Sequence, residues 1–237
     1  NYGAFFRCLT VKNLLGLKAK FTLGDFSKFE PGSEKFDTIV ACGILYHMSD
    51  PVGLLKKLSE MADNIFIWTH YFEEDLEKWS PMATKQLNAG KWDLENIETH
   101  NINGINIRTV RQNYGKALGW GGFCGGNETF SYWIFKQDLL KLLKSLGFVN
   151  IRIPLYFDQV DHQHGPCFAV LASKVPNREN IDVEYYLDPE INPDLYKEFG
   201  QLPSIERESK AIEHFVALGR EEGRLPNRRA RNKTSKK

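Results

Sequence analysis

The sequence predicts an α/β fold built on a mostly parallel sheet. Residues 36–42 (FDTIVAC) and 64–69 (NIFIWT) are short apolar runs bounded by turn residues, which is typical of buried parallel strands. A stretch with helical spacing of apolar side chains lies between them. Strand, helix and strand at this distance form a βαβ unit, and such units have a right-handed crossover and parallel strands.

Local signals predict the first elements. Apolar spacing predicts a helix over residues 2–15, and residues 19–23 (AKFTL) have the pattern of a short strand. Asp50 followed by Pro51 predicts the start of the helix in the βαβ unit, because proline is favoured in the first helical turn.

The later elements differ in clarity. Residues 73–130 are irregular and rich in Trp, Asn and Gly, so we expect a long insertion or lid after a strand. Residues 136–146 (KQDLLKLLKSL) predict an amphipathic helix. Residues 148–153 and 167–173 read as two strands, and their short connection predicts an antiparallel hairpin.

A change in composition after Lys174 divides the chain into parts. We expect one domain over residues 1–174. Residues 182–226 predict a small helical module, which is too short for a robust independent core and should therefore dock on another surface; a solvated helical tail is the alternative. Residues 227–237 are basic and polar, so we expect them to be disordered.

Composition argues against several classes of protein. The formal net charge is +1 over 237 residues, so no overall field favours nucleic acid or a membrane. The four cysteines form no CxxC pair, which argues against a zinc motif or a disulfide framework. No apolar run is long enough to span a membrane. We therefore expect reduced thiols and a cytoplasmic location.

Residues suited to ligand binding follow all three predicted strands of the N-terminal half. In an open α/β sheet, ligands bind beyond the carboxyl ends of the strands. These ends carry Asp25 and Phe26, then Ala41, Cys42, Gly43 and His47, and finally His70 and Tyr71.

Four segments carry a resemblance to a known family: GDF, FDTIVACGILYHMSDP, NIFIWTHYF and FCGGNETFSYWIFKQDLLKLLKSLGF. They resemble class I S-adenosylmethionine (SAM)-dependent methyltransferases, in particular the subgroup that includes the tRNA wobble-uridine carboxymethyltransferase. The resemblance covers residues 1–174. It implies a Rossmann-like methyltransferase sheet, SAM as cofactor and methyl transfer as activity.

The resemblance also implies cofactor-binding roles. Asp25 would accept a hydrogen bond from the adenine amino group, and Phe26 would stack on the ring or donate from its backbone. Ala41, Cys42 and Gly43 would lie against the methionine part of SAM, where small residues let the backbone approach the ligand closely. The structural alternatives are a turn or cap for Asp25 and an inert core thiol for Cys42.

The resemblance places His47, His70 and Tyr71 around the acceptor. Methyl transfer needs a base only when the acceptor is a hydroxyl or a protonated amine, and the two histidines are the candidates because histidine titrates near neutral pH. The structural alternatives are a helix cap for His47 and plain wall residues for His70 and Tyr71.

One family feature is absent from this sequence. The glycine-rich loop after the family's first strand and the acidic residue after its second strand have no counterpart before the predicted helix at 2–15. We therefore expect an N-terminally incomplete methyltransferase domain, in which the family's strongest cofactor contacts are missing.

Two further motifs have competing interpretations. Residues 119–126 (GWGGFCGG) lack the Lys-Ser/Thr of a phosphate loop, so we favour a flexible lid over the acceptor site. His162 and His164 are spaced like a metal-binding pair, but the sequence nearby offers no third ligand. We favour a plain loop between strands and predict no metal.

The favoured function is methyl transfer to a small-molecule, glycan or lipid-linked sugar acceptor. Residues 182–226 resemble modules appended to bacterial glycosyltransferases and methyltransferases of surface-polysaccharide biosynthesis, which favours this acceptor class by association. The alternatives are a tRNA-modifying relative, which would need a broad basic surface, and a truncated, non-catalytic interaction domain.

Overall fold

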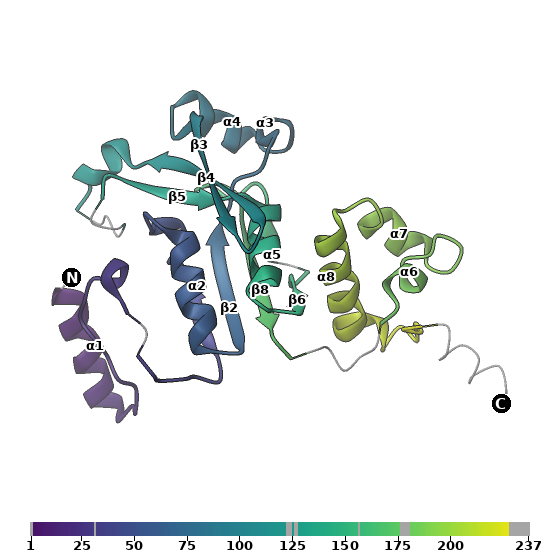
Figure 1. Cartoon of the computed structure of the whole chain (residues 1–237), viewed down its shortest axis with the longest axis horizontal. Coiled ribbons are helices and arrows are strands. Elements are labelled where there is room, and N and C mark those ends of the chain that lie inside the picture. The colour runs from purple at the N-terminus through teal and green to yellow at the C-terminus, as the bar shows by residue number, and fades with distance from the viewer. Residues whose placement is uncertain are drawn as a thin grey trace.

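The computed structural model describes residues 2–30, 32–121, 125, 128–155, 157–175 and 181–227 (Figure 1). A central sheet with its helices occupies the middle of the molecule. A second sheet crosses one end of it, an N-terminal helix lies on one flank, and a helical module lies on the other (Figure 1).

The central sheet has the strand order β1-β2-β8-β6, and the short β7 pairs with β8. β1 and β2 are parallel, whereas β8 is antiparallel to both β2 and β6, so β1, β2 and β6 share one direction. The expected α/β sheet, mostly parallel with an antiparallel C-terminal hairpin, is therefore confirmed. Its strands are β1 (Ile39–Cys42), β2 (Asn64–His70), β6 (Asn150–Arg152), β7 (Asp158–Gln159) and β8 (Cys167–Ser173).

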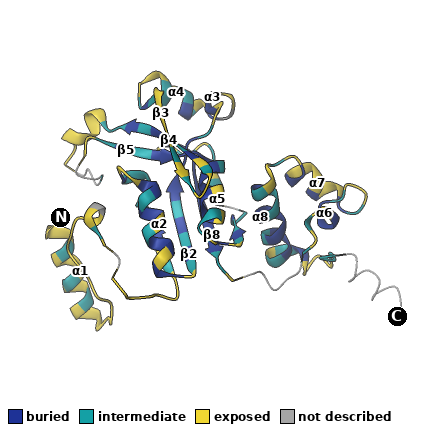
Figure 2. Ribbon diagram, viewed as in Figure 1, coloured by how far each residue is buried: buried dark blue, intermediate teal, exposed yellow. Residues whose placement is uncertain are grey.

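Two helices join the sheet in one hydrophobic core: α2 (Pro51–Met61) and α5 (Lys136–Ser145). α2 begins as expected, because the Asp50 side chain accepts a hydrogen bond from the Gly53 N–H (2.8 Å) and proline occupies the first turn. Buried and half-buried residues alternate along β2 as far as its last residue, His70, which is also buried (Figure 2). The core therefore lies mainly on one face of the sheet.

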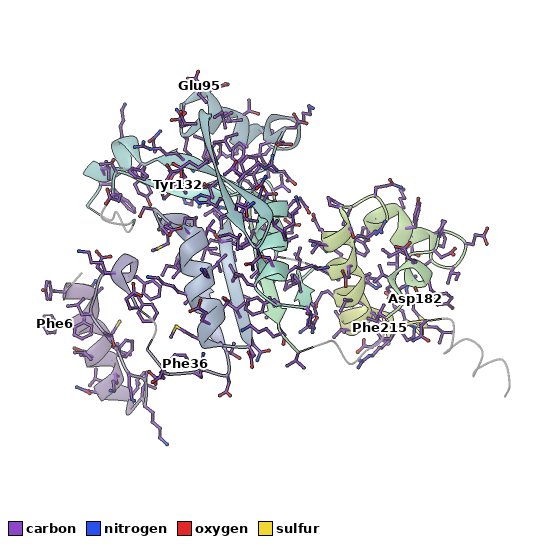
Figure 3. All side chains as sticks on the ribbon, viewed as in Figure 1. Phe6, Phe36, Glu95, Tyr132, Asp182 and Phe215 are labelled. Atoms are coloured by element: carbon purple, nitrogen blue, oxygen red, sulfur yellow. The ribbon has the colours of Figure 1, made fainter. Side chains whose placement is uncertain are left out.

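The predicted strand at residues 19–23 is wrong. These residues are exposed and lie in irregular chain after α1 (Tyr2–Leu15), the helix that the sequence predicted. A strand needs a neighbour for its backbone hydrogen bonds, and among the described residues β1 pairs only with β2. The chain instead runs past α2, where the Lys57 ammonium donates to the Phe29 carbonyl (3.0 Å). On α1 itself, Phe6 is 61% exposed (Figure 3).

Most of residues 73–130 form regular structure, which corrects the expectation of an irregular insertion. Antiparallel strands in the order β3-β4-β5 make a second sheet. The Tyr132 N–H donates to the Met48 carbonyl (2.9 Å), and the Phe72 N–H donates to the Ile134 carbonyl (3.0 Å), so this sheet is attached beside the ends of β1 and β2. Its elements are α3 (Leu76–Trp79), α4 (Pro81–Asn88), β3 (Trp92–Ile102), β4 (Ile105–Asn113), the 3₁₀ turn η3 (Gly115–Gly119) and β5 (Phe130–Ile134).

The C-terminal module, residues 181–227, has a small core of its own and packs through α8 against α5 and β6 (Figure 1). Of the two expectations for this segment, the structure has the docked module rather than a free helical tail. Residues 176–180, near the predicted domain boundary, and residues 228–237 of the basic tail lie outside the described residues. The module contains α6 (Val183–Tyr186), α7 (Pro193–Phe199), α8 (Ser204–His214) and the π turn η4 (Phe215–Gly219).

Among the described residues, no helix combines the length and the apolar character that a membrane span requires.

Candidate functional site

The candidate site lies where β1 and β2 end. Because these strands are parallel, with Cys42 opposite Trp68, their carboxyl ends meet at one edge of the sheet. Gly43 turns the chain there with φ +74°, a left-handed conformation that favours glycine, and its N–H donates to the Trp68 carbonyl (3.0 Å). The next residues form the 3₁₀ turn η2 (Leu45–His47), which folds back over this edge.

Tyr46 is the centre of an aromatic cluster at this edge. Its ring centre lies 4.2 Å from that of His47 and 4.5 Å from that of His70. His70 in turn stacks on Trp133 of β5, with 5.0 Å between ring centres and 15° between planes. The structure therefore brings two of the three predicted catalytic residues, His47 and His70, into contact with one tyrosine.

His47 is half-buried, and its Nδ1 lies 3.1 Å from the Tyr114 hydroxyl. Burial lowers its pKa, because the charged imidazolium loses solvation. The ring is therefore neutral at physiological pH and able to accept a proton.

His70 is buried at the end of β2. Its Nδ1 lies 2.9 Å from the Gly165 carbonyl and 3.1 Å from the Pro166 carbonyl. Two carbonyl acceptors require a donor, so Nδ1 carries the proton and Nε2 keeps a free lone pair. Burial lowers the pKa of His70 to about 4, which makes it a weak base at neutral pH.

Tyr71 does not join this aromatic cluster. It is fully buried, and its hydroxyl donates to Asp158 (3.2 Å). Asp158 also pairs with the buried Lys136 (3.0 Å), which reaches Glu206 of the C-terminal module (2.7 Å). Burial, with Asp158 next in importance, raises the pKa of Tyr71. Successive residues of an extended chain point in opposite directions, so His70 and Tyr71 face different surroundings.

The predicted cofactor residues are only partly brought together. Ala41 is buried and Cys42 is exposed at the end of β1, directly before Gly43. Asp25 is exposed in irregular chain and so does not follow a strand. Phe26 begins the 3₁₀ turn η1 (Phe26–Lys28) and borders a pocket of about 80 Å³ together with Met48, Ser49, Asp50, Gly53, Leu54 and Lys57.

Sequence reasoning missed the residues that the second sheet brings to the site. Lys91 lies beside the Trp133 ring, with its Nζ 4.7 Å from the ring centre, and donates to the His164 carbonyl (2.7 Å). Burial lowers the pKa of Lys91 to about 8. Without the second sheet, no pattern in the sequence connects these residues to β2. Half of the predicted lid at 119–126, namely residues 122–124 and 126, lies outside the described residues.

The fold also brings possible metal ligands close to the histidine pair, His162 and His164. The ring centres of His162 and His70 are 5.3 Å apart, and Cys167 lies beside them. His164 is the next ring along the loop, 5.6 Å from His162. Along the chain His162 had no third ligand nearby, but the sheet supplies two residues whose donor atoms could share an ion with it.

Comparison with known proteins gives a short match and several distant ones. No protein-family model matches the chain. A tRNA U34 carboxymethyltransferase of Sulfurimonas denitrificans (strain ATCC 33889 / DSM 1251) is 47% identical over 47 residues, which is 19% of this chain and 16% of that protein.

Two solved structures align over a larger share of the chain. The N-terminal domain of EvdMO1 with SAH bound aligns at 20% identity and a TM-score of 0.48, covering 72% of this chain and 60% of that one. A S-adenosylmethionine-dependent methyltransferase from Clostridium acetobutylicum ATCC 824 aligns at 12% identity and a TM-score of 0.38, covering 73% and 72%. The chain spans 16% of its curated relative and 60% of the EvdMO1 domain.

Proposed function

We propose that the protein is a SAM-dependent methyltransferase that acts on a small-molecule, glycan or lipid-linked sugar acceptor. The observation that carries this proposal is the shared edge of β1 and β2, where Gly43, Tyr46, His47 and His70 meet. The short likeness to a tRNA U34 carboxymethyltransferase supports a transferase of this general class.

The residues at the end of β1 are suited to SAM. Ala41, Cys42 and Gly43 are all small, and a side chain built on Gly43 would meet only the Tyr46 hydroxyl, at 3.8 Å. The backbone is therefore open to a closely approaching ligand. We assign these three residues to the methionine part of SAM, and Asp25 and Phe26 to the adenine.

SAM supplies a methyl group that its sulfonium already activates. The protein then has to bind and orient the acceptor and receive a proton if that acceptor is a hydroxyl or a protonated amine. We assign proton transfer to His47, and orientation of the acceptor to His70, because a pKa of about 4 makes His70 a poor base at neutral pH. Tyr71 supports the strand edge from its buried side.

A binding experiment tests the cofactor assignment. Calorimetry with SAH on the full-length protein is expected to give one site, and Gly43→Ala is expected to weaken binding about tenfold, a loss of about 1.4 kcal/mol. Gly90→Ala is the matched control, since Gly90 has the same left-handed backbone (φ +68°) with nothing within 4 Å. Full-length protein that binds no SAH would contradict the proposal.

A turnover experiment tests the histidines. His47→Ala is expected to lower SAH production with a glycan or sugar acceptor by roughly 10²- to 10⁴-fold, the usual contribution of a general base. His100→Ala, on β3 beside Thr109 (3.2 Å), is the control. Equal rates for the two variants would remove His47 from the mechanism.

The second candidate is a tRNA-modifying enzyme, which the 47-residue likeness favours. Offering the protein tRNA and sugar acceptors side by side separates the two, since modification of tRNA alone would replace the glycan proposal.

We also propose that residues 1–174 are the catalytic domain, that residues 182–226 are an appended module and that the protein is cytoplasmic. Cys8, Cys42 and Cys167 are free thiols, which supports that location.

A further inference from the structure

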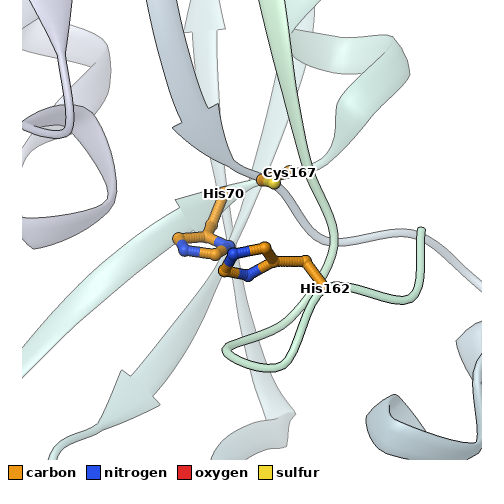
Figure 4. Close-up of side chains that lie close together, drawn as sticks. All are labelled: His70, His162 and Cys167. Carbon is orange, nitrogen blue, oxygen red and sulfur yellow. The ribbon is translucent and has the colours of Figure 1, made fainter. Parts of the chain in front are cut away.

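A cluster of three side chains beside the candidate site has the composition of a metal centre. One donor atom from each of His70, His162 and Cys167 can be chosen so that all three lie within 4.8 Å of one another (Figure 4). We propose that these residues bind a single Zn²⁺ ion. The proposal does not rest on methyl transfer, although it uses His70, which we assigned above to orienting the acceptor.

The sheet sets two of the ligands in place. His70 ends β2 and Cys167 begins β8, and the two residues are direct partners in the antiparallel ladder. Side chains of such partners stand on the same face of the sheet, with Cβ atoms about 4.5–5.5 Å apart. Both residues are buried, so the ladder presents an imidazole and a thiol side by side from a fixed backbone.

The third ligand comes from the connection between β7 and β8. His162 is only partly buried, and its ring is turned toward His70 (Figure 4). Zn–N distances of about 2.0 Å and Zn–S distances of about 2.3 Å imply roughly 3.5 Å between ligand atoms of a tetrahedral site. Donor atoms as much as 4.8 Å apart therefore have to close by up to about 1.3 Å, and rotation of the loop residue His162 can shorten its own two distances.

The hydrogen bonds of His70 suit a ligand. Its Nδ1 lies at hydrogen-bond distance from the carbonyls of Gly165 and Pro166, so an ion bound through Nε2 would keep both hydrogen bonds, whereas one bound through Nδ1 would break them. Metal-bound histidines almost always have their second nitrogen held in this way by a carbonyl or carboxylate. Two neighbouring carbonyls thus fix both the tautomer and the ring plane.

Two features of the ligands oppose binding of the ion, because each has an interaction or a proton that binding would remove. Burial, together with Asp158, raises the pKa of Cys167 to about 11, so the ion has to displace the thiol proton. The Nδ1 of His162 accepts an exposed hydrogen bond from the His164 N–H (3.2 Å), which is lost if that nitrogen binds the ion.

The donor set selects the kind of metal. Two imidazoles and one thiolate suit Zn²⁺ and its substitute Co²⁺, whereas Mg²⁺ and Ca²⁺ prefer oxygen ligands. Three protein ligands leave a fourth position for water or another small ligand, as in zinc sites that take part in chemistry. Because His70 also contacts Tyr46, that ion would lie next to the aromatic cluster.

Cobalt substitution tests the proposal on full-length protein freed of metal with a chelator. Co²⁺ is expected to bind with a stoichiometry of one, to give the sulfur-to-cobalt charge-transfer band and the intense visible bands of a tetrahedral thiolate site, and to be displaced by Zn²⁺. Cys167→Ser is expected to abolish the charge-transfer band. Cys8→Ser is the matched control, because Cys8 is exposed on α1 and outside the cluster.

His162→Ala guards against misfolding, since it alters a loop rather than the buried ladder. It is expected to weaken Zn²⁺ binding by roughly 100-fold or more, because even loss of an outer partner costs 10- to 100-fold. His164→Ala, two residues along, is expected to bind nearly as tightly as the unaltered protein. A cobalt spectrum without a thiolate band, or equal affinities for the two histidine variants, would overturn the proposal.

Discussion

The N-terminal segment, residues 2–36, and the C-terminal module flank the same sheet and differ sharply in burial. No residue of α1 is buried, and Leu14 is 79% exposed. In the module, Tyr186 is 0% exposed and Phe215 is 5% exposed, although both regions are rich in apolar residues. Apolar spacing therefore predicts a helix in each case, but it does not predict whether that helix finds a surface to cover.

The module is packed because the chain closes on itself. The Asp182 N–H donates to the Pro226 carbonyl (3.0 Å), and Arg224 pairs with Asp194 (2.7 Å). The buried pair of Lys136 and Glu206 then joins the module to α5. By contrast, no residue of α1 is buried. Four predictions test this contrast, from the largest effect to the smallest.

The largest effect is expected where the module meets α5. Glu206→Ala leaves Lys136 buried with one partner fewer, and should cost about 3 kcal/mol of unfolding free energy, measured in urea. Glu208→Ala on the same helix removes an exposed pair with Lys144 and should cost less than about 1 kcal/mol. Equal losses would show that the buried pair does not hold the module.

A glycine in each region gives the second test. A side chain built on Gly219 would lie 2.1 Å from the Tyr186 hydroxyl, so Gly219→Ala should overpack the module and cost roughly 1–3 kcal/mol. Gly24 has nothing within 4 Å, and Gly24→Ala should change stability by less than about 0.5 kcal/mol. Thermal unfolding of both variants measures the difference. Similar melting temperatures for the two would contradict the packed core of the module.

The third test is the pH dependence that His214 gives the module. Burial lowers the pKa of His214 below its usual value of 6.5, so the unfolded chain binds its proton first as the pH falls. This residue's contribution is complete above pH 6.5 and is lost as the pH falls through 6.5 toward the lower folded pKa. Its slope cannot exceed about 1.4 kcal/mol per pH unit.

Urea midpoints between pH 7.5 and 5 should therefore fall less steeply for His214→Gln than for the unaltered protein. The substitution also changes the partner of the Tyr186 hydroxyl, which lies 2.9 Å from His214, so the two proteins are compared by slope and not by absolute stability. Parallel slopes would mean that His214 does not titrate differently in the two states.

The smallest effect is expected on α1. Leu14→Ser should change the unfolding free energy by less than about 0.5 kcal/mol, because the side chain is already in solvent. Chemical denaturation followed by tryptophan fluorescence measures this. A loss above about 1 kcal/mol would show that α1 is covered in solution, so that it would not differ in burial from the module.

Sequence reasoning predicted the central sheet because its strands carry their own signals. Residues 36–42 and 64–69 are short, largely apolar runs between turn residues. β2 is buried or half-buried along its length, whereas β1 lies at the edge of the sheet, with Val40 67% exposed. The strand predicted at 19–23 failed because its alternation needed a partner strand, and none of the described residues provides one.

The second sheet was missed although one strong signal was present. Asn103 and Gly104 have φ of +51° and +81° and form the turn between β3 and β4, and Asn-Gly is the favoured pair for such tight hairpins. The aromatic cluster around Tyr46 and the proposed zinc site could not be predicted from local sequence patterns. They depend on pairing across the sheet, such as His70 with Cys167, which local patterns do not encode.

The ion pairs next to Tyr71 couple the C-terminal module to the strand that carries His70. Cutting the chain after Lys174 would remove Glu206 and Lys210 together, and would leave Lys136 and Asp158 facing water at the base of the segment that carries His70. A shortened protein would therefore be expected to lose order at the strand edge beside His70, which lies at the opposite end of β8 from the cut.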